Sequence, residues 1–415
     1  MSVAATPGSP SRSQLARRGE RTQLSSFLTN RIQRIEVSAT MAVAAEAEKL
    51  RAAGAQLVDL GAGEPHFHTP QHIKDAAIAA IQHNVTKYTA VGGTAELRDA
   101  IVQRHAADFG SDYRREDCIA SVGGKHALFN AIQVLVDHGD EVILPVPYWV
   151  SFKDIVRYAG GEPVYIPTDE RHDFALTADM AERAITPRTK IIILNSPNNP
   201  SGAVMDPAHM TEVLRLAHDR GIYVVSDECY VYLNHTGHKF SAGCVHEVKE
   251  RLIIIGSLSK TYAMTGWRLG YALGPAPIIA AMNKLQSQST SNPTSFVQKA
   301  AVAALTGSQD CVKEMLAQYI VLRDKVVAGL RAIPGITCAA PNGAFYAYPN
   351  VSHYFDRGGM NSAADVARRL LHDAHVVVVP GEGFGTQDHV RISYATSEEN
   401  LAKGLERMRE FFARV

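Results

Sequence analysis

Short apolar runs alternate with helical stretches through the middle of the chain, from about residue 119 to 275. The runs are continuous and rich in valine and isoleucine, as in buried strands, and they lie at 141–145, 190–195, 222–228 and 251–256. They are separated by stretches with helical spacing at 125–139, 179–185 and 210–221. Gly139 and Gly221 end two of these stretches, as helix C-caps often do. This alternation predicts a mainly parallel sheet covered by helices on both faces.

The two ends of the chain are more helical and contain fewer apolar runs. Helices are expected over 31–55, over 69–84 and from about 300 to 333. Two short strands are expected at 344–349 and 375–380, followed by a last helix that Ser397 caps.

The expected fold class is therefore α/β, with a large central domain and a smaller α+β domain built from both chain ends. We place the boundaries as a flexible tail at 1–25, the first part of the small domain at 26–62, the large domain at 63–303, and the rest of the small domain at 304–415.

The composition of the 415 residues excludes several classes of partner. Lys+Arg and Asp+Glu both total 42, so no net charge attracts nucleic acid or an anionic membrane. No apolar run approaches the ~20 residues that span a bilayer. The five cysteines form no C-x-x-C pair, which argues against a disulfide framework or a zinc site and favours the cytoplasm. The first twenty residues, rich in Ser, Ala, Pro and Arg, predict a disordered tail, with an organellar transit peptide as the alternative.

Residues capable of chemistry follow the expected strands, where open α/β sheets bind their ligands. Lys260 comes just after the run 251–256, where a partly desolvated amine could form a Schiff base and a solvated loop lysine is the alternative. Asp227 leaves an apolar strand and needs a cation, an N-cap role or a buried salt bridge. Gly123 and Gly124 open a helix after a strand, which is the geometry of an anion site.

Two further strand ends add amide and aromatic groups. The turn 195–202, "NSPNNPSG", offers three asparagine amides, and Trp149 follows the run 141–145. Each alone could be a turn or core packing, but together they describe one pocket with an acid, a lysine, a flat aromatic wall and a phosphate cradle. No G-x-G-x-x-G follows a strand and no serine nucleophile motif is present. A metal site at His66, His68 and His72 is a minor alternative, because no carboxylate partner stands out.

These residues stand in motifs that resemble one family in order and spacing, from about residue 24 to the C-terminus. The motifs are "GEPHFHTP", "KYTAVGGTAELRDAI", "VGGKHALFNA", "PYWVSF", "NSPNNPSGAV", "SDECY", "SLSKTYAMTGWRLGYA" and "HVRISYATSEENL". The chain resembles the class I, fold-type I aminotransferases that depend on pyridoxal phosphate. The resemblance is closest to the bacterial aspartate aminotransferase and prephenate aminotransferase subgroup, which has G-G-K where other members have G-G-T.

The resemblance implies that pyridoxal 5′-phosphate is the cofactor and that Lys260, Asp227 and Tyr230 are the catalytic residues. Lys260 matches the lysine that binds the cofactor and moves the substrate proton. Asp227 matches the aspartate that pairs with the pyridine nitrogen, which makes the ring an electron sink. Tyr230 and Asn199 match the residues that bond the phenolic oxygen.

Further positions match the remaining cofactor and substrate contacts of the family. Trp149 stacks on the ring, and the phosphate is bound by Gly124, Lys125, Ser257 and Arg268, with Tyr88 reaching the site of a partner subunit. The resemblance therefore implies a homodimer with shared active sites. Arg391 matches the arginine that binds the substrate α-carboxylate in a bidentate pair. Further substrate contacts fall at Gly63, Lys125, Trp149, Asn195 and Asn199.

Three features of the sequence affect which substrate is expected. Ser287 stands where animal-type enzymes have an arginine for the distal carboxylate, and the resemblance gives that role to Lys125. Prephenate aminotransferases of the subgroup use the same lysine with a threonine, which Thr40 in "SATMAV" matches, unless Thr40 is a helix cap. His66 and His68 replace two acids of many relatives, a change that either eases the access of dianions to the pocket or has no effect on specificity.

The expected function is transfer of an amino group between L-aspartate and 2-oxoglutarate by a ping-pong mechanism. The alternative is transfer to prephenate, alone or as a second activity. A lyase or decarboxylase on the same fold is disfavoured by the complete carboxylate clamp. A cofactor-sensing regulator is disfavoured because the N-terminal extension is too short for a DNA-binding domain.

Overall fold

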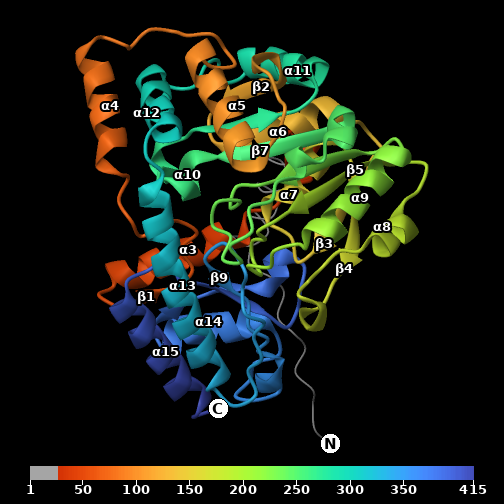
Figure 1. Cartoon of the computed structure of the whole chain (residues 1–415). Coiled ribbons are helices and arrows are strands. Elements are labelled where there is room, and N and C mark those ends of the chain that lie inside the picture. Colours follow the sequence, from red (N-terminus) through yellow and green to blue (C-terminus); the bar gives the residue numbers. More distant parts are fainter. Residues whose placement is uncertain (1–26) are drawn as a thin grey trace, which may run out of the picture.

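A seven-stranded sheet forms the centre of the larger part of the molecule (Figure 1). The structure is a computed structural model, and it describes residues 27–415, so the flexible tail expected at 1–25 lies outside the described residues. In spatial order the strands are β2 (Cys118–Ser121), β8 (Gly270–Leu273), β7 (Leu252–Ser257), β6 (Tyr223–Asp227), β5 (Thr189–Asn195), β3 (Glu141–Val146) and β4 (Glu162–Pro167). The pairs from β7 to β4 are parallel, and only β8 runs antiparallel to its neighbours. The prediction of a mainly parallel sheet is confirmed.

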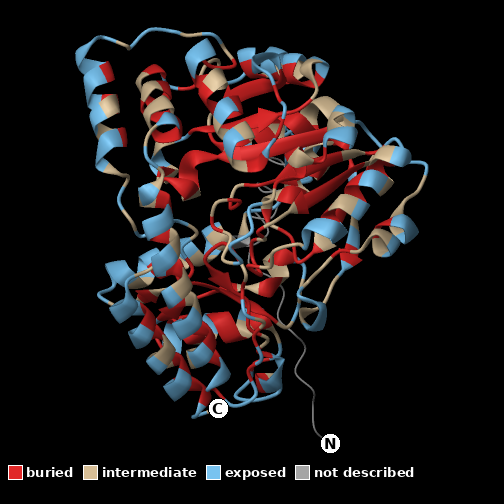
Figure 2. Ribbon diagram, viewed as in Figure 1, coloured by how far each residue is buried: buried red, intermediate tan, exposed pale blue. Residues whose placement is uncertain are grey.

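Helices cover both faces of this sheet, because alternate strand residues enter two separate cores. Ile192 and Leu194 of β5 pack in one core, and Ile191 and Ile193 pack in the other. The strands are buried between layers of half-exposed helices (Figure 2). The helices of this part are α4 (Gln71–Gln82), α5 (Ala95–Phe109), α6 (Gly124–Leu135), α7 (Ser151–Ala159), α8 (Ala178–Ala184), α9 (Pro207–Asp219), α10 (Leu258–Thr261), α11 (Ala276–Ser287) and α12 (Ser295–Thr306).

The smaller part joins the two ends of the described chain. Val58 of β1 (Val58–Asp59) pairs in parallel with Val376 of β10 (Val376–Val377), and the Ser393 N–H donates to Leu60 O at 2.7 Å. A second small sheet has the antiparallel order β11 (Val379–Pro380), β12 (Val390–Ser393) and β9 (Tyr346–Ala347). The surrounding helices are α2 (Asn30–Gln33), α3 (Ala39–Ala52), α13 (Asp310–Arg331), α14 (Ala363–Asp373) and α15 (Glu398–Phe412).

Helix α13 crosses from one part to the other (Figure 1). Val312 near its start packs in a core of the seven-stranded sheet, whereas Met315 and Tyr319 pack in the core of the smaller part. The proposed division into 63–303 and 26–62 with 304–415 remains a proposal, and α13 would be its main connection.

Several expected helices differ in the structure. The helix expected over 31–55 is two helices, since β-branched Ile35 and Val37 separate α2 from α3. The helix expected from 300 to 333 is broken at Gly307, after which the Ser308 hydroxyl accepts from the Asp310 N–H at 3.2 Å.

Two shorter expectations are also wrong. Gly139 caps no helix, because α6 ends at Leu135 and Val136 is already extended. The strand expected at 375–380 is two strands, since β10 pairs with β1 and β11 pairs with β12.

Within residues 27–415, no helix has the length and apolar character needed to cross a membrane. All five cysteines are free thiols.

Candidate active site

A cavity of about 350 Å³ opens between the carboxyl ends of β5, β6 and β7 and the smaller part of the molecule. Its walls come from segments distant in sequence, including the start of α3, the start of α6 and β12. The residues of the sequence-based site that line it are Thr40, Gly63, Gly124, Lys125, Trp149, Asn195, Asn199, Asp227, Tyr230, Ser257, Lys260, Arg268 and Arg391.

Asp227 places a buried carboxyl group at one side of the cavity. Its Oδ1 accepts the Cys229 N–H at 3.1 Å, and no cation pairs with it anywhere in residues 27–415. Burial raises the pKa of Asp227 to about 7, and the charge of Glu228 adds to the rise. The Asn195 amide donates to Asp227 O at 3.0 Å and so holds the end of β6 against the end of β5. A buried acid without a cation fits a ligand that brings a protonated nitrogen.

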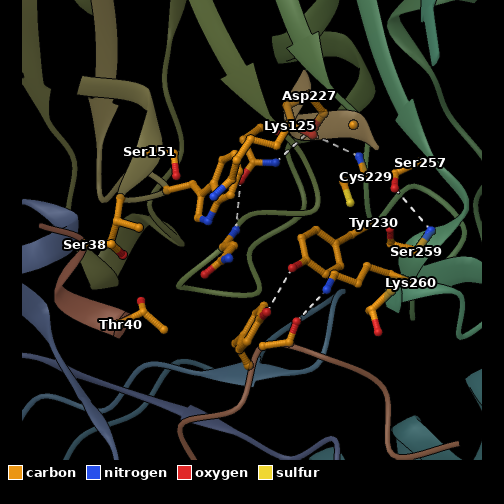
Figure 3. A pocket seen from close by; sticks show the side chains of 18 of the residues that line it. Ser38, Thr40, Lys125, Ser151, Asp227, Cys229, Tyr230, Ser257, Ser259 and Lys260 are labelled. Carbon is orange, nitrogen blue, oxygen red and sulfur yellow. Dashed lines mark hydrogen bonds between the residues drawn. The ribbon is translucent and has the colours of Figure 1, made fainter. Parts of the chain in front are cut away.

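Lys260 follows β7 in α10 and faces the cavity (Figure 3). Its Nζ donates to Gly63 O at 2.5 Å, and no carboxylate pairs with it in the described part of the chain. Burial lowers the pKa of the Lys260 amine, and the charges of Arg391 and Arg268 lower it further. A neutral amine is both a nucleophile and a base, which are the two tasks expected of this lysine.

The start of α6 forms a cradle that only glycine permits. Gly123 has φ +88°, and a Cβ there would lie 2.6 Å from Nη2 of Arg268. A Cβ on Gly270 would lie 2.2 Å from the backbone N of Gly124. The first N–H groups of α6 therefore face the cavity beside Arg268 and the Ser257 hydroxyl, which is the donor set of a phosphate site.

Arg391 supplies a buried cation from β12. It is 2% exposed, its Nη1 donates to Asn199 Oδ1 at 3.0 Å, and its Nη2 donates to Gly61 O at 2.8 Å. Its Nε is buried and has no hydrogen-bond partner among residues 27–415. A guanidinium held in this way has donors to spare for a carboxylate.

The aromatic wall and the far side of the cavity complete the site. The Nζ of Lys125 lies 4.8 Å from the Trp149 ring centroid, and its removal from solvent together with the charge of Arg268 lowers the pKa of Lys125. Thr40 and Ser38 lie across the cavity from Lys260 (Figure 3). The alternative that Thr40 is a helix cap is wrong, because the cap position of α3 is Ser38.

Three expected sites stand apart from this cavity. Tyr88 is 91% exposed and does not line it. His66 and His68 line a shallow depression beside it that shares Thr265 and Arg268. Residues 27–415 contain no group of three or more metal-ligating side chains placed to hold a metal ion.

The sequence analysis missed several lining residues, of which Tyr346 is the most informative. Its hydroxyl lies 2.9 Å from the Tyr230 hydroxyl, and its ring centroid lies 4.5 Å from the Arg391 guanidinium. The alternation of Tyr346 and Tyr348 within an expected strand was the available signal for one shared face. The other lining residues missed are Ser38, Met41, Val150, Ser151, Cys229, Ser259 and Thr265.

Comparison with known proteins places this site in a family. The sequence model of the family described as aminotransferase class I and II matches residues 55–408. An aspartate aminotransferase of Geobacillus stearothermophilus is 44% identical over 386 residues, 92% of this chain and 98% of the relative. An aspartate/prephenate aminotransferase of Thermus thermophilus is 44% identical over 391 residues, 94% of this chain and 98% of the relative. The solved structure of an aspartate aminotransferase from Thermus thermophilus with maleate is 43% identical, covers 92% of this chain and 99% of its own, and has a TM-score of 0.88.

Proposed function

The chain belongs to the class I and II aminotransferase family, and on that premise we propose that it moves an amino group between L-aspartate and 2-oxoglutarate. The observation that carries the proposal is one cavity that joins an amine, an unpaired buried acid and two cations, namely Lys260, Asp227, Lys125 and Arg391. A dicarboxylate needs two cations, and an amino-group transfer needs the amine and the acid.

The residues of the cavity fit pyridoxal 5′-phosphate. The fit rests on the buried acid Asp227, which has no cation of its own, and on the glycine cradle beside Arg268. Asp227 would hold the ring nitrogen, Trp149 the ring face, Tyr230 and Asn199 the phenolic oxygen, and the start of α6 with Ser257 and Arg268 the phosphate. When bound, this group supplies an aldehyde that accepts the substrate amine and a ring that withdraws electrons from the substrate α-carbon.

The protein's own groups then bind and orient the substrate. Arg391 holds the α-carboxylate with donors already aligned by Asn199 and Gly61, and Lys125 holds the distal carboxylate. Lys260 Nζ, whose pKa burial lowers, is placed to take a proton from the substrate α-carbon and to release it again. Burial keeps Tyr230 a neutral phenol, because it raises the pKa of this group well above its ordinary value.

Prephenate is a second candidate acceptor, favoured by the position of Thr40. Its side chain lines the same cavity as Lys125, and the relative from Thermus thermophilus is an aspartate/prephenate aminotransferase. Prephenate carries two carboxylates and a ring hydroxyl, so a threonine hydroxyl offers it a partner that aspartate does not need.

The exposure of Tyr88 supports a homodimer with shared sites. A tyrosine that is 91% exposed and does not line the cavity of its own chain is available to reach the site of a second copy. A cytoplasmic location is part of the same proposal, and five free thiols suit a reducing compartment.

A single-turnover experiment tests the proposed function. The enzyme is converted to its amine form with L-aspartate or L-glutamate, and oxaloacetate or prephenate is then added separately while the cofactor absorbance is followed. If oxaloacetate alone restores the absorbance, the enzyme is dedicated to aspartate, and if prephenate restores it about as fast, both acceptors are substrates. If neither dicarboxylic donor changes the absorbance, the proposal is wrong.

A further inference from the structure

His389 lies two residues before Arg391, just before β12 begins at Val390, and its backbone pairs with Asn350 in an isolated antiparallel bridge. In an extended backbone alternate residues point the same way, so His389 and Arg391 share one face. A column of rings joins the two side chains. The Arg391 guanidinium lies 5.1 Å from the Phe384 ring centroid, Phe384 meets Tyr348 edge to face at 6.0 Å, and Tyr348 stacks on His389 at 4.8 Å. A displacement of His389 would therefore reach the arginine through packed rings as well as through two residues of backbone.

His389 is itself held between two carboxylates. It is 5% exposed, its Nδ1 lies 2.8 Å from Asp388 Oδ1, and its Nε2 lies 3.7 Å from Glu170 Oε2. Its Nε2 is buried and makes no hydrogen bond within the described residues, so the attraction to Glu170 is its main interaction there. A buried histidine between two acids is stabilised in its charged form.

Glu170 belongs to the other part of the molecule. It lies in the loop that follows β4, the edge strand of the seven-stranded sheet, and accepts a hydrogen bond from the Thr337 hydroxyl at 3.0 Å. From the same loop, Phe174 lies 5.7 Å from the His389 ring and 6.0 Å from the Tyr348 ring, between centroids. The loop after β4 thus reaches the strand that carries Arg391.

The neighbouring carboxylates favour the protonated form of His389. Burial lowers the pKa of His389, but the hydrogen bond and charge of Asp388 and the charge of Glu170 outweigh it, so the pKa is raised. The bond from His389 lowers the pKa of Asp388, and His389 and Thr337 lower that of Glu170 despite its burial. The titratable and charged groups around this cluster are Asp388, Glu170, Tyr348, Glu382, Cys338, Arg391 and Arg331.

We propose that His389 is a positioning residue for Arg391, and that its ion pair with Glu170 fixes the substrate-binding strand against the edge of the large sheet. The inference rests on the proposed function, in which Arg391 holds the substrate carboxylate. His389 itself does not line the cavity and touches no reacting atom. The raised pKa of His389 determines how the ion pair depends on pH. The pair is complete below the ordinary pKa of histidine and is lost as the pH rises through the raised value.

The experiment measures binding of maleate, a dicarboxylate with no amino group to transfer, to the holoenzyme by calorimetry at pH 6.0, 7.5 and 9.0. His389→Gln and Glu170→Gln keep side-chain size and remove one charge each. We expect each to weaken maleate binding about tenfold at pH 6.0 and by progressively less at pH 7.5 and 9.0, because the wild-type pair is lost as His389 gives up its proton. The double variant should be no weaker than the worse single variant, because both remove the same pair.

A matched control separates positioning from general damage. Asp173→Asn removes an exposed carboxylate from the same loop at a left-handed residue, φ 52°, which asparagine tolerates, and it should bind maleate as the wild type does at each pH. Unfolding temperatures verify that every variant is folded. Equal binding by wild type and His389→Gln at pH 6.0, or a defect that does not change with pH, would overturn the inference while leaving the proposed function in place. A wild type that does not bind maleate would instead refute the dicarboxylate site, and the inference with it.

Discussion

The two walls of the cavity differ in how the chain builds them. The wall formed by the ends of β6 and β7 carries Asp227 and Lys260, whose positions follow directly from the strands that precede them. The opposite wall carries Thr40 from α3 and Arg391 from β12, which are 351 positions apart in the chain and line one cavity because the two chain ends pack together, as in the pairing of β1 with β10. In the proposed function the reacting groups lie on the first wall, and the second wall holds the α-carboxylate and contacts the acceptor.

The charges on the two walls differ in the same way. Asp227 and Lys260 have no ion-pair partner in residues 27–415. Burial raises the pKa of Asp227 and lowers that of Lys260, and both shifts favour the neutral form of the group. Arg391 is already aligned by Asn199 and Gly61. A catalytic group that must change its protonation gains from being unpaired, whereas a group that only binds gains from being held in place. Substitutions on the first wall should therefore stop the reaction, and those on the second should change which substrate is used.

The largest effect is expected from Lys260→Ala on the catalytic wall. Loss of the amine proposed to bind the cofactor and move the proton should lower the transamination rate by about 10⁵-fold or more. The measurement is steady-state turnover of aspartate, with reduction by borohydride as a test for a covalent adduct. Lys239→Ala, at an exposed lysine paired with Asp108, is the control and should keep wild-type turnover. Wild-type turnover by Lys260→Ala would refute the whole assignment.

The next largest effect is the pH dependence of the cofactor-free protein. Asp227 has its pKa raised from 3.8 to about 7, so the folded state binds this proton more tightly than the unfolded state does. Its ionisation therefore costs stability as the pH rises from about 4 to 7, by about 4 kcal/mol once complete. Denaturant unfolding of wild type and Asp227→Asn between pH 4 and 8 measures this cost. The wild type should lose stability relative to the variant as the pH rises, and a constant difference would contradict the assignment of an unpaired acid.

The difference between the two walls explains which parts of the site the sequence could predict. Strands β5, β6 and β7 are short apolar runs ended by polar residues, so both their existence and the residues at their ends follow from local pattern. The motifs around Asp227 and Lys260 are contiguous, and a resemblance based on them places the reactive groups directly.

The second wall was harder to predict because it depends on contacts distant in sequence. The sequence predicts one strand where the structure has β10 and β11. Its apolar pattern does not show that Val376 pairs with β1 and Val379 with β12. The role of Tyr346 depends on the hydroxyl of Tyr230, 116 positions away in the sequence, and that of His389 on Glu170 from the loop after β4. No local pattern specifies such partners, so the geometry was required.

A smaller effect is expected from Arg391→Lys on the binding wall. Lysine keeps the charge but cannot donate to Asn199, Gly61 and a carboxylate in one plane. The KM values for aspartate and glutamate should both rise, with kcat/KM about 10²-fold lower, since two charge-assisted hydrogen bonds are lost. Arg407→Lys, at a half-buried arginine outside the cavity that also donates to backbone carbonyls, is the matched control and should leave KM unchanged. Unchanged KM values in Arg391→Lys would remove this arginine from the binding site.

The smallest effect, and the sharpest test of the second wall, is expected from Thr40→Val. Valine keeps the branched shape at this half-buried position in the first turn of α3 and removes only the hydroxyl, which caps no helix. If that hydroxyl serves prephenate, the single-turnover rate with prephenate should fall about five- to tenfold, the value of one hydrogen bond, while the rate with oxaloacetate stays the same. Thr40→Ser restores the hydroxyl and should restore the prephenate rate. An equal fall with both acceptors would make Thr40 a packing residue of α3 and remove it from the choice between acceptors, since Lys125, proposed to hold the distal carboxylate of both, does not distinguish them.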